Sequence, residues 1–483
     1  STLLVEGVGG VLYPFQSAGV AYASDRERCF IADSMGLGKT VQALCTIHHK
    51  KVYPSLIVCP ASLKWNWAKE AQTWLPDKTV HVIEAGKNGP IPRVDLVVVN
   101  YDLLSKHKDT LVMRAFQSVI FDESHFLKSP KAHRTKAAKY IATGIPVRLA
   151  LTGTPVLNRP AELCSQLDIL GRLEEFGGWW KFVHRFAGAH RNRFGLDTSG
   201  ATHLEELNDK LRSICYVRRS KKEVLPELPD KVRSVIEVDI ENRTEYDAAE
   251  SDTIGWLKGR AAQDTAFLTS IAHLPEDAQI EAKRQRSNEA GEKAARAEAL
   301  VRIEALKQLA VKGKMGAIRE WIETFLESGE KLVVFAYHRS VQQDLVREFE
   351  GAERIFAEDD PRDRQRNVDR FQEDPACRLI ICSLQAGGVG ITLTAASNVL
   401  FTELGWTPAT MNQAEDRLHR IGQKDSVTAY WMIGKETIDV DIAALLERKA
   451  QVVDAATDGA GAVAQESMLK ELVEKLIRKG AKA

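Results

Sequence analysis

Short apolar runs that alternate with charged helical stretches occur in two separate parts of the chain, and this pattern limits the possible fold more than any other feature. Each run is followed by turn or capping residues. Such alternation is typical of a parallel sheet covered by helices. The sequence therefore predicts an α/β protein with two parallel-sheet lobes. The predicted strands are 29–32, 56–59, 96–99, 119–121 and 148–151 in the first lobe, and 332–336, 379–382, 399–401 and 427–432 in the second.

Two regions outside these strands have a helical composition. Residues 160–215 are aromatic, whereas residues 241–312 are rich in Ala, Glu, Lys, Arg and Gln, which favour long helices with charged outer faces. These helices protrude from the lobes or, as an equally weighted alternative, merely connect them. Pro226 and Pro229 mark a joint, because proline interrupts a helix. We expect a first lobe over residues 1–225 with a helical protrusion at about 160–215, a linker with a second protrusion over 226–314, a second lobe over 315–460 and a C-terminal helix over 461–483.

Composition and charge exclude several classes of protein. The 483 residues include 66 Lys and Arg and 66 Asp and Glu, and a charged share of 27% beside 44% hydrophobic residues excludes a collagen-like or largely disordered chain. No apolar run approaches the roughly 18 residues of a membrane span, and residues 1–10 lack the pattern of a signal peptide. The seven cysteines form no C-x-x-C pair, so we expect buried thiols in a reducing compartment and no zinc site.

Residues 33–40, which read Asp-Ser-Met-Gly-Leu-Gly-Lys-Thr, follow the first predicted strand and open a helical pattern. Glycines let backbone N–H groups approach phosphate oxygens, and a helix N-terminus favours negative charge. Lys39 can reach the β- and γ-phosphates of a nucleotide, and Thr40 can bind Mg²⁺. Asp33 replaces the first glycine of the strict pattern, so a chance Gly-rich turn is the alternative. The segment predicts a phosphate-binding loop.

An acidic pair, Asp122 and Glu123, follows the apolar run 119–121. A magnesium-nucleotide site at the carboxyl end of a strand needs one carboxylate for the metal and one to orient the attacking water. We assign Asp122 to the metal and Glu123 to the water. An exposed Asp-Glu turn is the alternative, and the phosphate loop some 80 residues upstream argues against it.

Six segments stand in order along the chain, at residues 12–16, 33–40, 122–125, 151–155, 385–391 and 413–423. The last reads Gln-Ala-Glu-Asp-Arg-Leu-His-Arg-Ile-Gly-Gln and is highly specific. Together these segments resemble the helicase motifs of the Swi/Snf family, which belongs to helicase superfamily two, and the resemblance covers about residues 11–455. Segments at 121–128, 159–163 and 402–408 are similar to the branch that holds the HepA-related annealing helicase.

This resemblance implies two RecA-like lobes that share an ATP site. Gln16 would read the adenine edge, and Arg417 and Arg420 would approach the γ-phosphate from the second lobe. The two arginines also fit on chemical grounds, because phosphoryl transfer spreads negative charge that a guanidinium stabilises. The expected cofactors are ATP and Mg²⁺. The expected site consists of the catalytic residues Lys39, Asp122, Glu123, Arg417 and Arg420, the nucleotide-binding residues Gln16, Gly36, Gly38, Lys39, Thr40, Gly388 and Gln413, and the metal ligands Thr40 and Asp122.

DNA is expected to cross both lobes on the face where loops follow strands. Hydroxyls, loop amides and basic side chains there can hold phosphates without reading sequence. Trp65 is expected to be a core residue and not a base stacker. Thr152, Thr154 and His125 would couple the nucleotide state to DNA. The expected DNA contacts are Ser62, Lys64, Asn100, Tyr101, His338, Arg339, Gly390 and Thr392.

The family resemblance implies an ATP-dependent translocase on double-stranded DNA that remodels or anneals branched DNA. Two alternatives stay open, a strand-separating DNA or RNA helicase and a weakly catalytic ATP-binding clamp on nucleic acid. The presence of Lys39, Glu123, Arg417 and Arg420 argues against the clamp. We expect a monomer that binds double-stranded or branched DNA and no membrane. Its expected location is the cytoplasm for a prokaryotic or phage protein, or the nucleus for a eukaryotic one.

Overall fold

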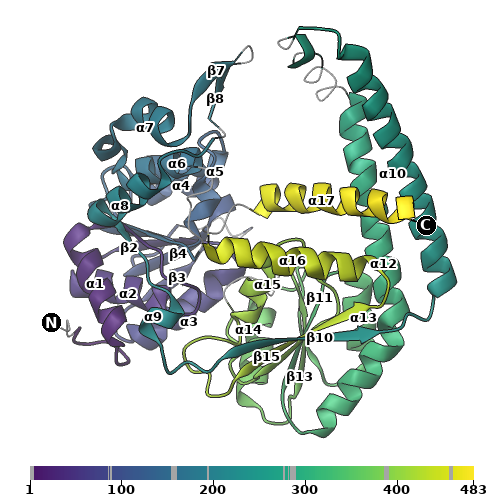
Figure 1. The fold of residues 1–483 in the computed structure, drawn as a ribbon. Helices are drawn as coiled ribbons and strands as arrows, with labels where there is room; N and C mark the ends of the chain where they lie inside the picture. Colours follow the sequence, from purple (N-terminus) through teal and green to yellow (C-terminus); the bar gives the residue numbers. More distant parts are fainter. Residues whose placement is uncertain are drawn as a thin grey trace.

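Two parallel β-sheets with helices packed against them form the two lobes of the computed structural model (Figure 1). The structure describes residues 5–84, 86, 90–153, 160–192, 195–198, 200–275, 278–280, 282, 290–385, 391–455 and 461–482. Each predicted strand is present within two residues of its expected bounds. The α/β fold with two parallel-sheet lobes is therefore confirmed.

The first sheet has the strand order β3-β4-β2-β5-β6-β1-β9, and its neighbouring strands run parallel. Every residue of β2 and β4 is buried, which explains their continuous apolar sequences. Leu56 and Val58 belong to one buried cluster and Ile57 and Cys59 to the other, so the sheet separates two cores. Its strands are β1 (Arg28–Ile31), β2 (Ser55–Cys59), β3 (Val80–Val82), β4 (Leu96–Asn100), β5 (Ser118–Phe121), β6 (Val147–Leu151) and β9 (Tyr216–Val217).

Loops between the strands and helices of the first lobe contribute residues to the site described below. The main ones are α1 (Pro14–Arg26), α2 (Lys39–His49), α3 (Lys64–Trp74), α4 (Leu104–Val112) and α5 (His133–Ala142), with the short 3₁₀ turns η1 (Ala61–Leu63), η2 (Tyr101–Leu103) and η3 (Ser124–Leu127). A helical region follows β6, as predicted from the aromatic stretch. It contains α6 (Pro160–Leu170), η4 (Leu173–Phe176), α7 (Gly178–Phe186), the hairpin β7 (His190–Asn192) and β8 (Gly195–Asp197), and α8 (Leu204–Ile214); the four-residue helix α9 (Lys221–Val224) comes after β9.

The second sheet has the order β10-β15-β14-β11-β13-β12. Its strands are β10 (Lys231–Val238), β11 (Leu332–Ala336), β12 (Glu353–Ile355), β13 (Leu379–Ser383), β14 (Asn398–Phe401) and β15 (Val427–Gly434). The helices of this half are α13 (Arg339–Glu348), α14 (Pro361–Glu373), α15 (Pro408–Glu415) and α16 (Ile438–Ala455), with the long pair α10 (Arg243–Ile271) and α12 (Ala290–Glu327), and α17 (Gly461–Lys482). In Figure 1 the pair α10 and α12 extends well beyond the sheet.

Strand β10 corrects the expected linker over residues 226–314. All eight of its residues pair in parallel with β15, so this segment is the edge strand of the second sheet. It was not predicted because charged residues such as Lys231 and Arg233 interrupt its apolar sequence and none of its residues is fully buried, unlike the continuous apolar runs of the central strands. We propose that the second lobe comprises residues 231–238 together with most of the chain from about 315 to 455.

The two lobes meet where α3 of the first faces α14 of the second. Trp65 lies here, half-buried, with the Arg362 guanidinium 4.4 Å from the centroid of its ring. The expectation that Trp65 is a core residue was therefore wrong. An ion pair of 2.5 Å between Lys69 Nζ and Asp369 Oδ1 adds a second contact between these helices.

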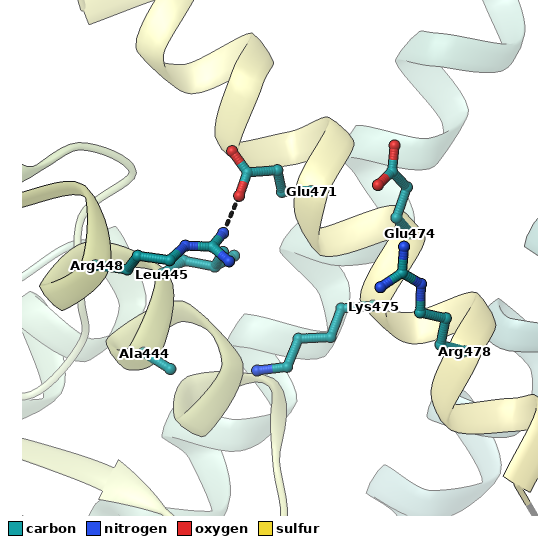
Figure 2. A pocket seen from close by; sticks show the side chains of 7 residues that line it. All are labelled: Ala444, Leu445, Arg448, Glu471, Glu474, Lys475 and Arg478. Atoms are coloured by element: carbon teal, nitrogen blue, oxygen red, sulfur yellow. Dashed lines mark hydrogen bonds and ion pairs between the residues drawn. The ribbon is translucent and has the colours of Figure 1, made fainter. Parts of the chain in front are cut away.

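Helix α17 packs across α16 and α10 (Figure 1). Its apolar face inserts Met468, Leu472 and Leu476 into the core of the second lobe. Figure 2 shows the hollow between α16 and α17, where Arg448 reaches toward Glu471 and both basic and acidic side chains line the walls. The C-terminal helix thus packs against the second lobe and contributes side chains to its core. Among the described residues, no helix is both long and apolar enough to cross a membrane.

Replacing Leu472 by alanine is expected to destabilise the second lobe, because the side chain is 1% exposed and its removal leaves a cavity. The expected loss is about 2–5 kcal/mol of unfolding free energy. Thermal unfolding followed by circular dichroism would show a lower midpoint for Leu472→Ala. Lys470→Ala, at an exposed position on the same helix, should leave the midpoint unchanged. Equal midpoints for both variants would show that α17 does not dock in solution.

Candidate functional site

A cavity of about 310 Å³ lies between the lobes, and residues from both lobes line it. Ligand pockets of proteins begin at about this size. The structure brings together most of the residues predicted from the phosphate loop, the acidic pair and the arginine motif. The lining includes Gln16, Gly36, Gly38, Lys39, Thr40, Glu70, Asp122 and Glu123 from the first lobe and Thr392, Arg417 and Arg420 from the second.

The phosphate loop has a conformation that requires its glycines. Gly36 and Gly38 have φ values of +81° and +72°, which side chains rarely permit. A Cβ at Gly38 would lie 2.4 Å from Nε2 of Gln16, and one at Gly36 would lie 2.6 Å from Cβ of Arg420. The loop therefore packs against both α1 and the arginine motif, and α2 begins at Lys39, as expected for an anion-binding helix terminus.

Gln16 is tied to this loop by its side-chain amide. Its Nε2 donates a hydrogen bond of 3.3 Å to the carbonyl oxygen of Leu37, and its Oε1 accepts one of 3.0 Å from the backbone N–H of Tyr13. The side chain is 4% exposed and lines the cavity. Its fixed orientation fits the predicted role of reading one edge of a bound base.

Asp33, the residue that departs from the strict phosphate-loop pattern, is fully buried. Arg219 donates from Nε to Asp33 Oδ1 at 3.0 Å and from Nη2 to Oδ2 at 2.6 Å, and Gln42 Nε2 donates to Oδ2 at 2.9 Å. This bidentate pair fixes the start of the loop where the common pattern has glycine. Arg219 was not predicted, since it lies 186 positions away and no local signal identifies it.

Three cationic side chains converge in the cavity. Lys39 donates from Nζ to the carbonyl oxygen of Asp33 at 2.8 Å, and burial lowers its pKa. Burial and the charge of Arg420 lower the pKa of Arg417 to about 10, and burial lowers that of Arg420. Cations gathered in a desolvated site repel one another, and a bound polyphosphate relieves that repulsion. The site therefore fits an anionic ligand with several charges.

The acidic pair lies beside these cations. Asp122 accepts a hydrogen bond of 2.7 Å from Nε1 of Trp67 and one of 3.0 Å from the backbone N–H of Glu123. Burial and the neighbouring Glu123 raise the pKa of Asp122 to about 6. Burial alone would raise the pKa of Glu123 as well, but the neighbouring His125 and Lys39 lower it. His125 Nδ1 lies 3.3 Å from Glu123 Oε2. The two desolvated carboxylates and Thr40 line the same cavity, and together they are a donor set that suits a hard divalent cation.

The structure corrects several expected DNA contacts of the first lobe. Lys64 is buried, and its ammonium donates to the carbonyl oxygen of Ile83 at 2.8 Å. The Tyr101 hydroxyl donates to the carbonyl oxygen of Asp122 at 2.7 Å, so this buried side chain supports the acidic pair. Asn100 is also buried, at the end of β4, whereas Ser62 is half-buried in η1. Of these side chains, Ser62 alone keeps some exposure.

In the second lobe, the half-buried ring of His338 lies against two acidic side chains. Its Nδ1 contacts Glu403 and its Nε2 lies 3.5 Å from Glu304 Oε2, which corrects its prediction as a DNA contact. Arg339 is exposed, with an ion pair of 3.1 Å to Glu358. Thr392 accepts a hydrogen bond of 2.7 Å from Arg420 Nη1 and lines the cavity, so its side chain belongs to the nucleotide side.

The other predicted residues are placed as follows. Gln413 lies half-buried on α15 and is not among the described residues that line the cavity. Thr152 is fully buried, and the next residue is close to the phosphate loop, since a Cβ at Gly153 would lie 3.4 Å from Lys39 Nζ. Gly388, Gly390 and Thr154 lie outside the described residues.

The pKa of His338 predicts a pH dependence of stability. Burial by itself would lower this pKa, but the hydrogen bonds to Glu304 and Glu403 raise it to about 9. A histidine whose pKa is higher in the folded state contributes stability that is complete below its unfolded value of about 6.5 and is lost as the pH rises through about 9. The unfolding midpoint of the wild-type protein should therefore fall from pH 6.5 to 9 more steeply than that of His338→Gln. Parallel curves would contradict this account.

The sequence of the chain matches two protein-family models and is similar to several known proteins. Residues 15–282 match the model of the SNF2-related domain, and residues 313–422 match that of the helicase conserved C-terminal domain. The mouse (Mus musculus) DNA annealing helicase and endonuclease ZRANB3 is 36% identical over 469 residues, which cover 93% of this chain and 41% of that protein.

Two further similarities were found. The SWI/SNF-related matrix-associated actin-dependent regulator of chromatin subfamily A-like protein 1 of Xenopus tropicalis is 34% identical over 456 residues, 92% of this chain and 45% of that protein. The chain thus spans less than half the length of these two relatives. The solved SWI2/SNF2 ATPase core of Sulfolobus solfataricus in complex with double-stranded DNA matches 94% of each chain at 23% identity and a TM-score of 0.44.

Proposed function

The chain belongs to the SNF2-related domain family, and from this premise we propose that it is a DNA-dependent ATPase that moves along double-stranded DNA and remodels or anneals branched DNA. The observation that carries the proposal is the cavity itself. Lys39 and the acidic pair come from the first lobe, and Arg417 and Arg420 come from the second, so the site is complete only when the lobes are together.

The residues of the cavity fit ATP and a divalent metal, which we propose to be Mg²⁺. Bound ATP supplies the phosphoanhydride whose terminal phosphoryl group is transferred to water. The loop N–H groups and Lys39 hold the phosphates, while Thr40 and Asp122 are the proposed metal ligands. Glu123, with its lowered pKa, stays ionised and orients the attacking water. Arg417 and Arg420 stabilise the charge that develops on the transferred group.

Hydrolysis is proposed to drive movement because the site spans two lobes. Closure brings the arginines to the phosphates, and their loss of contact after hydrolysis favours opening. The two states then differ in their affinity for ATP and ADP, which is what a motor cycle requires. Contacts from loops at the carboxyl ends of the strands would transmit the motion to DNA. Ser62 and Arg339 are the predicted side chains that stay accessible there.

Annealing or remodelling of branched DNA is proposed by analogy with the relatives, one of which is named an annealing helicase. The phosphate-contacting chemistry predicts little sequence preference and a strong dependence on salt. A strand-separating helicase is the second candidate, and a weakly catalytic clamp is disfavoured by the convergence of three cations and two carboxylates in one cavity. We propose that the protein acts as a monomer in the compartment that holds the DNA, a prokaryotic cytoplasm or a eukaryotic nucleus.

The proposed function predicts that duplex or forked DNA stimulates ATP hydrolysis more than single-stranded DNA or RNA does. Lys39→Ala removes a phosphate contact and Glu123→Gln removes the carboxylate that orients water, so each should lower the turnover number by about 10²-fold or more. A coupled assay of ATP hydrolysis with each nucleic acid measures both effects. Equal rates without nucleic acid, or stimulation by RNA alone, would contradict the proposal.

Displacement of a third strand from a triplex separates the two helicase-like candidates. A translocase on duplex DNA displaces the third strand without separating the duplex. A strand-separating helicase also releases a strand from a forked duplex. Glu123→Gln is the matched control, because it should keep nucleotide binding and lose both activities.

A further inference from the structure

The short segment that follows β9 contacts both halves of the cavity without lining it. β9 is the edge strand of the first sheet, beside β1, and residues 219–225 leave it toward the second lobe. Within the described chain, neither Arg219 nor Lys221 is among the residues that line the cavity. Their side chains are directed to the two loops that carry the catalytic groups.

On the first-lobe side, Arg219 holds the phosphate loop. Besides its bidentate pair with Asp33, its Nη2 donates to Gln42 Oε1 at 2.9 Å, and its carbonyl oxygen accepts from the backbone N–H of Ser34 at 3.0 Å. Arg219 Nη1 also contacts the carbonyl oxygen of Phe15. The start of the phosphate loop is therefore fixed to this segment by side chain and backbone together.

On the second-lobe side, Lys221 holds the arginine motif. Its Nζ lies 2.9 Å from Asp416 Oδ1 and donates to the carbonyl oxygen of His419 at 2.5 Å. These two residues directly precede Arg417 and Arg420. Lys221 also touches the phosphate loop, since a Cβ at Gly36 would lie 3.5 Å from its Cε. One side chain thus bridges the two loops at the point where they meet.

Apolar contacts reinforce the bridge. Leu37 of the phosphate loop and Leu225 at the end of α9 are buried in one small cluster, and Ile421 of the arginine motif packs against them. Leu37 and Ile421 come from different lobes, and the segment supplies Leu225 beside them. The Lys221 and Asp416 side chains are themselves only 13% and 17% exposed, so water weakens their ion pair less than it weakens a surface pair.

The two neighbouring acids of the arginine motif have different partners. Glu415 is fully buried and paired within the second lobe, to Arg233 at 2.8 Å and to Lys231 at 2.8 Å, both on β10. Asp416 pairs across the lobes with Lys221 and lies farther, at 3.6 Å, from Lys231. Glu415 thus anchors the motif to its own sheet, while Asp416 sets its position relative to the phosphate loop.

We propose that Lys221 is a positioning residue for ATP hydrolysis, which with Arg219 sets the distance between the phosphate loop and the two arginines in the closed state. The inference rests on the proposed ATPase function and extends it to residues outside the cavity. Lys221 touches no reacting atom. Its loss should leave ATP binding to the first lobe intact and misplace Arg417 and Arg420.

The test compares Lys221→Met with Lys69→Ala, which removes a different, exposed ion pair between the lobes. Lys221→Met should lower the turnover number by up to about 10²-fold, because small misplacements of catalytic groups are costly, with the KM for ATP within about twofold of wild type. Lys69→Ala should change neither value. Lys221→Arg, which keeps the cation, should restore part of the rate.

A double-mutant cycle and a distance measurement complete the test. Adding Asp416→Asn to Lys221→Met should lower the turnover number little further, because both changes remove the same contact. Dyes at Asp25→Cys and Glu350→Cys, exposed positions on the two lobes, should report a broader inter-lobe distance distribution in Lys221→Met than in the otherwise unchanged protein. The native cysteines are all buried and should not compete for the dyes.

Each outcome decides the inference. An unchanged turnover number, an equal loss in Lys69→Ala, or multiplying effects in the double mutant would overturn the positioning role. If the wild-type protein showed no DNA-stimulated ATPase, the proposed function would fail. The distance distribution would still test whether Lys221 holds the two lobes in a fixed arrangement. An unchanged distribution in Lys221→Met would then overturn it.

Discussion

Buried charge is the constraint on which this structure depends. Lys39, Asp122 and Glu123 of the first lobe share one cavity with Arg417 and Arg420 of the second, and burial lowers the pKa values of Lys39 and Arg417. Desolvation lowers the pKa values of the cations and raises that of Asp122, so the site is arranged for a ligand that carries both several negative charges and a metal. A nucleotide polyphosphate with a divalent metal, which we propose to be Mg²⁺, meets both requirements.

Surrounding residues keep these charges in place. Tyr101, Trp67 and His125 hold the acidic pair, and Arg219 and Gln42 hold the phosphate loop through Asp33. On the other side, β10 supplies Lys231 and Arg233, which fix the arginine motif to the second sheet. Hydrogen-bonded groups with little rotational freedom keep catalytic side chains close to their working geometry. Precise placement is needed because phosphoryl transfer is accelerated mainly by positioning and electrostatic stabilisation.

The contact between the lobes has a solvent-exposed part and a more buried part. Lys69, Asp369 and Arg362 form exposed contacts between α3 and α14, which water and salt weaken. Lys221, Asp416 and the small cluster around Leu37 form the drier contact beside the cavity. Such a division suits the proposed closure, because exposed pairs contribute little energy and the more buried contact is the one that we propose sets the geometry.

Sequence patterns alone predicted the α/β fold, the central strands, the phosphate loop and the acidic pair. Those features are local: buried parallel strands are continuous apolar runs, and phosphate chemistry needs glycines and a lysine at fixed spacing. Packing between distant segments places β10 in the second sheet and directs Lys64, Tyr101 and His338 into the protein. The same packing brings Arg219 and Lys221 to the two loops. Each of these depends on partners between 19 and 198 positions away, and the direction of a side chain follows from packing that no short segment encodes.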